Sequence, residues 1–496
     1  MKRLYYTISA VALVAASPAM ADMTAADVWA DWQMQAEAAA SPITADVATT
    51  DTGLTLTNFS QTLVPQEDAD VVDMRALVEE VVLTENGDGT VTMTFSQPYT
   101  VDVRFDGGTD GLTILLNHEN LSVVASGSPE DRTYTYSADL ITAAIGEIVG
   151  PADEIPEIDL DMAITDFGSV FTLMGTEPEN TRISSESAIG SITMAVEIRG
   201  PESEPGTLKV GLQIADIAET SSGSFDAVYS MATPEGLSQD AADLTADITY
   251  ASLGMELQFE DPSESFAALY SNDGGRMVVG FSPEAISYDV SATGAEAMVS
   301  GAEIPVPVEI STGSTQIAFS MPVFAGEAPQ DMGLRLSVQD LMVGESLLGM
   351  VDPGQAFPRD PASLLIDATG QLQLFVDLMT LDPETMTGPP GELRAITVNE
   401  LNLSVGGAEL AGTADFSFAP GQLVPMPVGS ADLQLSGGNA LMETLVAGGM
   451  VPPAQSGMIM GMANVFARPG AAPDTLETTV EFGADGSITA NGVPLQ

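Results

Sequence analysis

Few side chains of this 496-residue chain can do nucleophilic or metal chemistry. There is no cysteine, and His118 is the single histidine. Thiolate nucleophiles, disulfides, zinc–thiolate sites and multi-histidine metal sites are therefore excluded. His118 stands in Asn-His-Glu-Asn (117–120), between two alternating apolar runs. It could act as a general base, but the turn-forming residues around it favour a place in a hairpin turn. The nucleophile-elbow pattern Gly-x-Ser-x-Gly is absent.

Carboxylates are the remaining candidates for chemistry, and they are abundant. The chain has 71 Asp and Glu against 13 Lys and Arg, a formal net charge of −58. Two acids suffice for glycoside hydrolysis, so a carboxylate-dependent hydrolase is one alternative, although no pair stands out. Residues 85–90 (Glu-Asn-Gly-Asp-Gly-Thr) resemble part of a calcium loop, but they lack the closing glutamate and favour a hairpin turn. We expect no metal and no cofactor.

The same charge limits the partners of the protein. A surface this negative repels phosphate backbones, which excludes nucleic acid. Eleven cations remain beyond Lys2 and Arg3, too few to neutralise the acids, so most carboxylates must be hydrated. This indicates either a salt-adapted habitat or a cationic partner.

A methionine cluster is the candidate surface for an apolar ligand. Met450, Met458, Met460 and Met462 gather around the last predicted helix. Methionine is flexible and adapts to irregular apolar partners. The alternative is ordinary core filling beneath a sheet. We assign no catalytic, cofactor-binding or metal residue.

Period-two alternation dominates from about residue 50 onward. It is clearest at 158–164, 192–198, 208–214 and 372–378, where polar residues such as Asp159, Asp161, Glu197 and Asp377 take the other face. This is typical of antiparallel strands with one packed face and one wet face. It predicts a mainly β fold: a long curved antiparallel sheet or two packed sheets, with a few helices at the N- and C-terminal ends.

Helices and turns are predicted from their end signals. Thr24 should cap a helix at 25–39, Asn439 one at 440–447, and Pro453 should begin one that runs to about 467. A single helical turn is expected at 345–350. Hairpin turns are expected at 86–89, 106–108, 272–275 and 485–486, which are rich in Asn, Asp and Gly.

The first 21 residues have the pattern of a secretory signal. Lys2 and Arg3 precede an apolar run at 8–16, and Ala19-Met20-Ala21 forms a small-residue cleavage site. We expect cleavage after Ala21 and a periplasmic protein, with secretion as the second choice. No later apolar stretch reaches about 18 residues, so no transmembrane span is expected after cleavage. The remainder divides into an N-terminal β-rich region at 22–339 and a C-terminal region at 340–496, or forms one continuous domain.

The C-terminal region carries a set of motifs in a fixed order. They are Ser-Leu-Leu-Gly-Met-Val-Asp-Pro (346–353), Phe-Pro-Arg-Asp-Pro-Ala (357–362), Gly-Glu-Leu-Arg (391–394), Gly-Gly-Ala-Glu-Leu-Ala-Gly-Thr (406–413), Gly-Gly-Asn-Ala-Leu (437–441), Phe-Ala-Arg-Pro-Gly (466–470) and Ala-Asn-Gly-Val-Pro-Leu (490–495). Together they resemble the DUF2125 family of exported alphaproteobacterial proteins of uncharacterised function. The resemblance implies a cell-envelope location and an alphaproteobacterial host, and it transfers no site residue. The rhythm of residues 406–418 is also similar to that of AsmA-like envelope proteins.

Three functions are compatible with these observations. The first is a non-enzymatic periplasmic or envelope protein that holds or conveys an apolar ligand, such as lipid, in a β-sheet groove. The second is a structural or partner-binding envelope protein without a ligand. The third is the carboxylate-dependent hydrolase.

Overall fold

The protein is one very wide antiparallel sheet with helices at its two ends. The computed structural model describes residues 22–495 except 64–70, 106–109, 151–155, 202–204, 231–238, 382–385, 387 and 423–424. It is 63% strand and 13% helical, and its 26 strands belong to one sheet. The mainly β prediction is confirmed in its single-sheet form. The predicted signal sequence and the predicted turn at 106–108 lie outside the described residues.

The strands of the N-terminal half are β1 (Ile43–Thr50), β2 (Gly53–Leu63), β3 (Val71–Glu85), β4 (Val91–Phe95), β5 (Tyr99–Phe105), β6 (Asp110–Glu119), β7 (Ser122–Ser128), β8 (Asp131–Val149), β9 (Glu157–Met174), β10 (Arg182–Arg199), β11 (Thr207–Ser224), β12 (Leu244–Tyr250) and β13 (Ser252–Glu260). Those of the C-terminal half are β14 (Ser265–Asn272), β15 (Gly275–Phe281), β16 (Ile286–Gly301), β17 (Val308–Met321), β18 (Gln330–Val343), β19 (Ala362–Leu374), β20 (Gly391–Val405), β21 (Ala408–Phe418), β22 (Pro427–Ser436), β23 (Arg468–Pro469), β24 (Thr475–Phe482), β25 (Ile488–Ala490) and β26 (Val493–Pro494). The helices are α1 (Ala25–Ala38), α2 (Phe225–Ser230), α3 (Glu345–Val351), α4 (Gly438–Ala447) and α5 (Pro453–Phe466), with short 3-10 turns η2 (Pro178–Asn180), η4 (Gln239–Ala241) and η5 (Leu378–Thr380).

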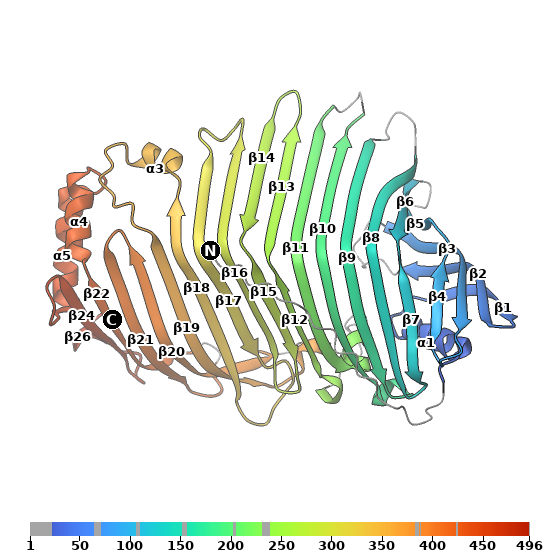
Figure 1. Cartoon of the computed structure of the whole chain (residues 1–496). Helices are drawn as coiled ribbons and strands as arrows, with labels where there is room; N and C mark the ends of the chain where they lie inside the picture. Colours follow the sequence, from blue (N-terminus) through green and yellow to red (C-terminus); the bar gives the residue numbers. More distant parts are fainter. Residues whose placement is uncertain are drawn as a thin grey trace, which may run out of the picture.

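Strands pair almost entirely with their neighbours in the chain. Strands β4 and β5 both pair with β3 and lie end to end as one interrupted strand. Strands β6 and β7 both pair with β8 and form a second interrupted strand. These two interrupted strands lie between β3 and β8 and pair with each other through β4–β7 and β5–β6. In the same way β12 and β13 form one interrupted strand, and β14 and β15 form the next. The colours of Figure 1 therefore run in sequence order from one end of the sheet to the other.

The sheet bends along a line that crosses its strands, and several strands have a residue with a left-handed backbone on this line. Five Asp or Asn residues, which tolerate this conformation, have φ between 50° and 54° there. They are Asn58, Asn120, Asp166, Asp216 and Asp340. The interruptions between β12 and β13 and between β14 and β15 lie on the same line across the sheet (Figure 1).

The bend keeps one apolar face continuous. A left-handed residue directs its side chain to the same side as the residue before it, so the alternation resumes with shifted parity. In β9 the apolar positions are even up to Ile164 and odd from Phe167, on either side of Asp166. The side that receives two consecutive residues is the longer one, so it is convex and the apolar face is concave.

Glycines make room for the bend. The Asp166 side chain lies over Gly190 of β10, where a Cβ would stand 2.9 Å from the Asp166 Oδ2 atom. Asp340 lies over Gly313 of β17 in the same way, at 2.8 Å. A larger residue at either glycine would push the aspartate side chain away from this position.

Helix α1 covers the concave face at the N-terminal end. Thr24 and Asp27 form the predicted capping box, and the helix packs on a core that reaches from Leu56 of β2 to Ile183 of β10. A buried polar cluster fixes it: the Asp31 carboxylate pairs with Arg132 and accepts a hydrogen bond of 2.6 Å from Tyr134 Oη. Burial raises the pKa of Asp31, against the lowering effects of Tyr134 and Arg132.

Most local predictions are confirmed, and four need correction. The helices at 25–38, 345–351, 438–447 and 453–466 and the turns at 86–89 and 485–486 are present. Residues 272–275 form the bend between β14 and β15 rather than a hairpin. The strand predicted through 378 ends at Leu374. Asn439 does not cap α4, because Asp474 accepts the backbone N–H groups of Asn439 and Ala440 (3.1 and 3.0 Å).

The fourth correction concerns His118. It lies within β6 and not in a hairpin, because β7 continues in the same direction beyond Asn120. Its backbone N–H donates to Gln97 Oε1 (3.0 Å), and burial lowers the pKa of its ring. The sheet is continuous through residue 340, which lies inside β18, so both proposed regions share one architecture.

Candidate functional site: an apolar trough

The concave face between β9 and β20 carries rows of apolar side chains that face one another across neighbouring strands. We call this face the apolar trough. One row crosses seven strands, from β12 to β20: Ile248, Met277, Val290, Ile317, Leu336, Ile366 and Leu401. Neighbouring strands lie about 4.8 Å apart, so this row is about 29 Å long.

The trough is open to solvent in the middle of the sheet. Nine of its large side chains are between 37% and 55% exposed, whereas the core side chains under α1, such as Leu56 and Val81, are below 10%. The nine are Met255, Leu257, Phe266, Met277, Val290, Ile310, Ile317, Phe319 and Leu334. A contiguous exposed apolar surface of this kind is unusual on a soluble protein and marks a binding surface.

Two clusters close parts of the trough. The α1 core closes it at the N-terminal end. At the lower strand ends, Val323 and Phe324 follow β17 and pack on Phe281, with the rings of Phe281 and Phe324 5.9 Å apart. The apolar trough is therefore covered at its N-terminal end and partly covered along the edge formed by the lower strand ends.

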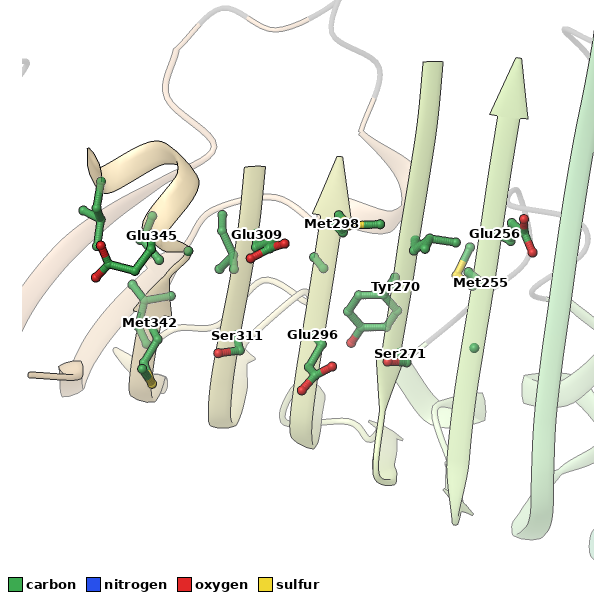
Figure 2. A pocket seen from close by; sticks show the side chains of 18 of the residues that line it. Met255, Glu256, Tyr270, Ser271, Glu296, Met298, Glu309, Ser311, Met342 and Glu345 are labelled. Carbon is green, nitrogen blue, oxygen red and sulfur yellow. The ribbon is translucent and has the colours of Figure 1, made fainter. Parts of the chain in front are cut away.

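A large hollow lies in the upper part of the trough, beside α3. It is a pocket of about 1130 Å³, above the usual 300–1,000 Å³ of small-molecule sites. A second apolar row lines it: Met194, Leu212, Met255, Tyr270, Ala297, Ile310 and Val343, one residue from each strand in turn. Figure 2 shows Met255 and Tyr270 on adjacent strands, with Glu345 of α3 at the other end of the pocket.

The loop after α3 borders this pocket with Phe357 and Arg359. Asp352 holds the loop, because its carboxylate accepts the N–H groups of Ala356 (2.9 Å) and Phe357 (2.8 Å) and a bond from Arg359 (3.1 Å). These bonds, the one from Ala356 foremost, lower the pKa of Asp352. Arg359 also pairs with Glu345 of α3 (2.9 Å).

The convex face is polar and carries most of the acids that the alternation placed on a wet face. Asp159 and Asp161 are exposed there, and Glu197 pairs with Arg199 and Lys209. Asp377, beyond the end of β19, is exposed and accepts the Ala325 N–H (2.7 Å). The convex face therefore carries more charge than the concave face, but the division is not complete. Val170 and Met174 are exposed on the convex face, and Glu256, Glu296, Glu309 and Glu345 line the pocket together with the apolar row.

Comparison of the chain with protein-family models, curated proteins and solved structures finds no match in any of the three. The resemblance to the DUF2125 family stays a prediction. In the part of the chain that the structure describes, no helix is both long and apolar enough to cross a bilayer. Within the same residues, no three or more His, Asp or Glu side chains gather in a way that could hold a metal ion.

The four predicted methionines lie outside the trough pocket. Met458, Met460 and Met462 are on α5, and Met450 is in the turn before it, at the C-terminal end of the sheet (Figure 1). Met458 and Met462 are exposed, and the other two are half-buried. Sequence reasoning missed the trough residues as a site, although the exposed ones occupy the apolar positions of alternating strands.

Proposed function

We propose that the protein is a non-enzymatic envelope protein that holds or conveys lipid, with acyl chains lying in the apolar trough. The main support for this proposal is the row of large apolar side chains that are about half exposed on a concave face. Burying such surface against hydrocarbon is favourable at about 25 cal/mol per Å². A ligand is the simplest way to cover it, since the described helices lie at the ends and edges of the sheet.

The dimensions favour a chain-like ligand. The row from Ile248 to Leu401 is about 29 Å long at about 4.8 Å per strand, close to the ~30 Å hydrocarbon core of a bilayer, which two acyl chains span. The pocket beside α3 continues the same surface and is larger than a compact small molecule needs. The predicted signal sequence supports a periplasmic location.

The alternative functions have less support. If the protein were structural and bound no ligand, Ile317 and its neighbours would stay exposed to water, and this apolar surface would lower the solubility of the protein. A carboxylate hydrolase needs an acid with a raised pKa in a cleft. Burial raises the pKa of Asp31, but this residue is paired with Arg132 beneath α1, away from the pocket.

Native mass spectrometry of the purified mature protein tests the proposal. We expect co-purifying lipid that is removed by organic extraction and regained from mixed micelles. Repeated purification without bound lipid, together with failure of the delipidated protein to take up a fluorescent phospholipid, would contradict it.

A further inference from the structure

Two polar side chains lie together at the N-terminal end of the apolar trough. Tyr99 of β5 pairs with Leu116 of β6, which stands two positions before His118. Tyr99 and His118 therefore lie on the same face of adjacent strands. The centres of their rings are 5.5 Å apart, and the ring of Phe95 lies 5.9 Å from that of Tyr99.

Both residues stand at the beginning of apolar rows on the concave face. The strand register leads from Tyr99 to Met194 and so into the row that lines the pocket, which we call the pocket row. The residues between them are Leu116, Ala143 and Met162. His118 begins the next row, beside Ile141. Four strand steps, about 19 Å, separate Tyr99 from Met194, and an acyl chain of about 15 Å, half of a bilayer core, covers three of them.

The hydrogen bonds of His118 determine which ring nitrogen carries the proton. Gln97 Oε1 accepts the backbone N–H of His118 (3.0 Å), so the amide nitrogen of Gln97 faces the ring and lies 3.3 Å from Nδ1. An amide nitrogen only donates, so Nδ1 accepts and the ring proton is on Nε2. Burial lowers the pKa of the ring, which keeps it neutral at pH 7.

Each ring therefore carries a hydrogen-bond donor without an acceptor. His118 Nε2 and Tyr99 Oη are buried, and neither has a partner among the described residues. Burial raises the pKa of Tyr99, so its hydroxyl keeps the proton. Buried polar groups nearly always have partners, so two neighbouring donors without one indicate an acceptor that comes from outside the chain. Both side chains as a whole are only half-buried, so rotation of a ring can present its donor to a ligand.

The surroundings of the pair favour an uncharged acceptor. The basic residues of β3 and β5 are Arg75 and Arg104, and Arg75 lies opposite Asp102. Asp102 and Arg104 stand at odd spacings from Tyr99, so both arginines are on the convex face. A carboxylate or phosphate beside the two donors would lack a counter-charge, and the net charge of −58 opposes any anion. Two neutral donors suit a neutral carbonyl oxygen, which has two lone pairs.

We propose that Tyr99 Oη and His118 Nε2 donate hydrogen bonds to the carbonyl oxygen of an acyl ester whose chain lies along the pocket row. This inference rests on the proposed function and names its ligand class, an acyl ester of glycerol rather than a free fatty acid. A buried water molecule in the same place would satisfy the donors, but it would give the protein no preference between an ester and an ether.

Competition binding with the delipidated mature protein tests the inference, with a fluorescent phospholipid as the displaced probe. The competitors are monopalmitoylglycerol, its ether analogue 1-hexadecylglycerol, and palmitate. The ester and the ether share the chain length and the glycerol headgroup and differ in the carbonyl group. We expect wild type to bind the ester about tenfold more tightly than the ether, which corresponds to two hydrogen bonds of ordinary strength. It should also bind the ester more tightly than palmitate.

Two variants assign this preference to the donors. Tyr99→Phe and His118→Phe should each reduce the preference for the ester about threefold and leave the affinity for the ether unchanged. Tyr288→Phe is the matched control, because it removes a hydroxyl beside Phe319 in the trough, and it should keep the full preference. Tyr99→Phe should not lower the unfolding free energy, since its hydroxyl has no partner in the described chain. Circular dichroism checks the folding of His118→Phe, which loses the bond from Gln97.

The outcomes separate this inference from the proposed function. Equal binding of ester and ether by wild type, an unchanged preference in both variants, or tighter binding of palmitate than of the ester would overturn the inference, while the lipid-holding function stands. Binding of neither the probe nor any competitor would contradict the proposed function and the inference with it.

Discussion

Replacing Ile317 by aspartate places a charge in the centre of the apolar trough. Ile317 is 55% exposed, between Val290 of β16 and Leu336 of β18. Because more than half of the side chain is already in water, the substitution should cost only about 1–2 kcal/mol of folding free energy from lost burial and strand preference. Binding of lipid should be affected much more.

The loss of binding has two parts. A ligand that covers the exposed part of Ile317 gains about 1 kcal/mol, roughly half the value of burying a whole isoleucine. An aspartate that faces hydrocarbon costs a further ~2.5–3.5 kcal/mol on membrane-insertion scales. The sum is about 4 kcal/mol. For an acyl chain that lies across this site, we therefore expect the dissociation constant to increase by about a hundredfold to a thousandfold.

The assay is titration of the delipidated protein with a fluorescent fatty acid or phospholipid, beside native mass spectrometry of the purified variant. Val170→Asp is the control, because Val170 is 42% exposed on the convex face of β9 and lies across from Glu186. It should bind lipid as wild type does. If folded Ile317→Asp binds within twofold of wild type, the trough is not where the ligand lies.

Three further predictions concern the parts that shape and border the trough. Arg132→Met leaves Asp31 buried beneath α1 without its cation and should lower the unfolding free energy by about 3 kcal/mol in urea titration; a loss below 1 kcal/mol would show that α1 is held by packing alone. Asp340→Val forces a β-branched residue into a left-handed backbone and should cost about 1–2 kcal/mol, whereas Asp340→Asn should cost little in the same assay. Since the pKa of Asp352 is lowered in the folded state, its stabilising effect is present above its ordinary value of 3.8 and is lost as pH falls through the lowered value; the protection factors of the amides in residues 352–361, taken relative to intrinsic exchange at each pH, should therefore fall as pH falls below about 4, and unchanged protection factors would contradict the role of this carboxylate.

The fold was largely predictable because each strand carries its own signal. Alternation such as that of residues 158–164 predicts a strand with one packed face and one face in water. A capping box such as that of Thr24 and Asp27 predicts the start of a helix. Antiparallel neighbours need only short turns, so local patterns and strand order agree.

The bend was harder to predict, although a trace of it is present. In β9 the apolar positions change parity around Asp166, and a shift of this kind is the sequence mark of a left-handed residue within a strand. Residues 272–275 show why such marks are ambiguous. Asp and Gly permit a positive φ in a hairpin and in a bend alike, and only the pairing of β14 and β15 with β16 decides between them.

The candidate site could not be predicted as a site. Alternation shows that Ile317 and Phe319 belong to the packed face, but it does not show what packs against them. A second sheet, a helix or a ligand would leave the same pattern. The methionines at 450–462 attracted attention because they are adjacent in sequence, whereas the trough residues are adjacent only across strands.

Because each strand pairs with its neighbours in the chain, the number of strands sets the length of the sheet. Removing one hairpin from the middle, such as β17 and β18, leaves two strands that can still pair antiparallel, and it shortens the sheet by about 10 Å at ~4.8 Å per strand. Duplicating a hairpin lengthens it by the same step, because the contacts that hold each strand are local. Related chains could therefore differ in reach by whole hairpins while keeping the same cross-section, the same bend and the same two ends.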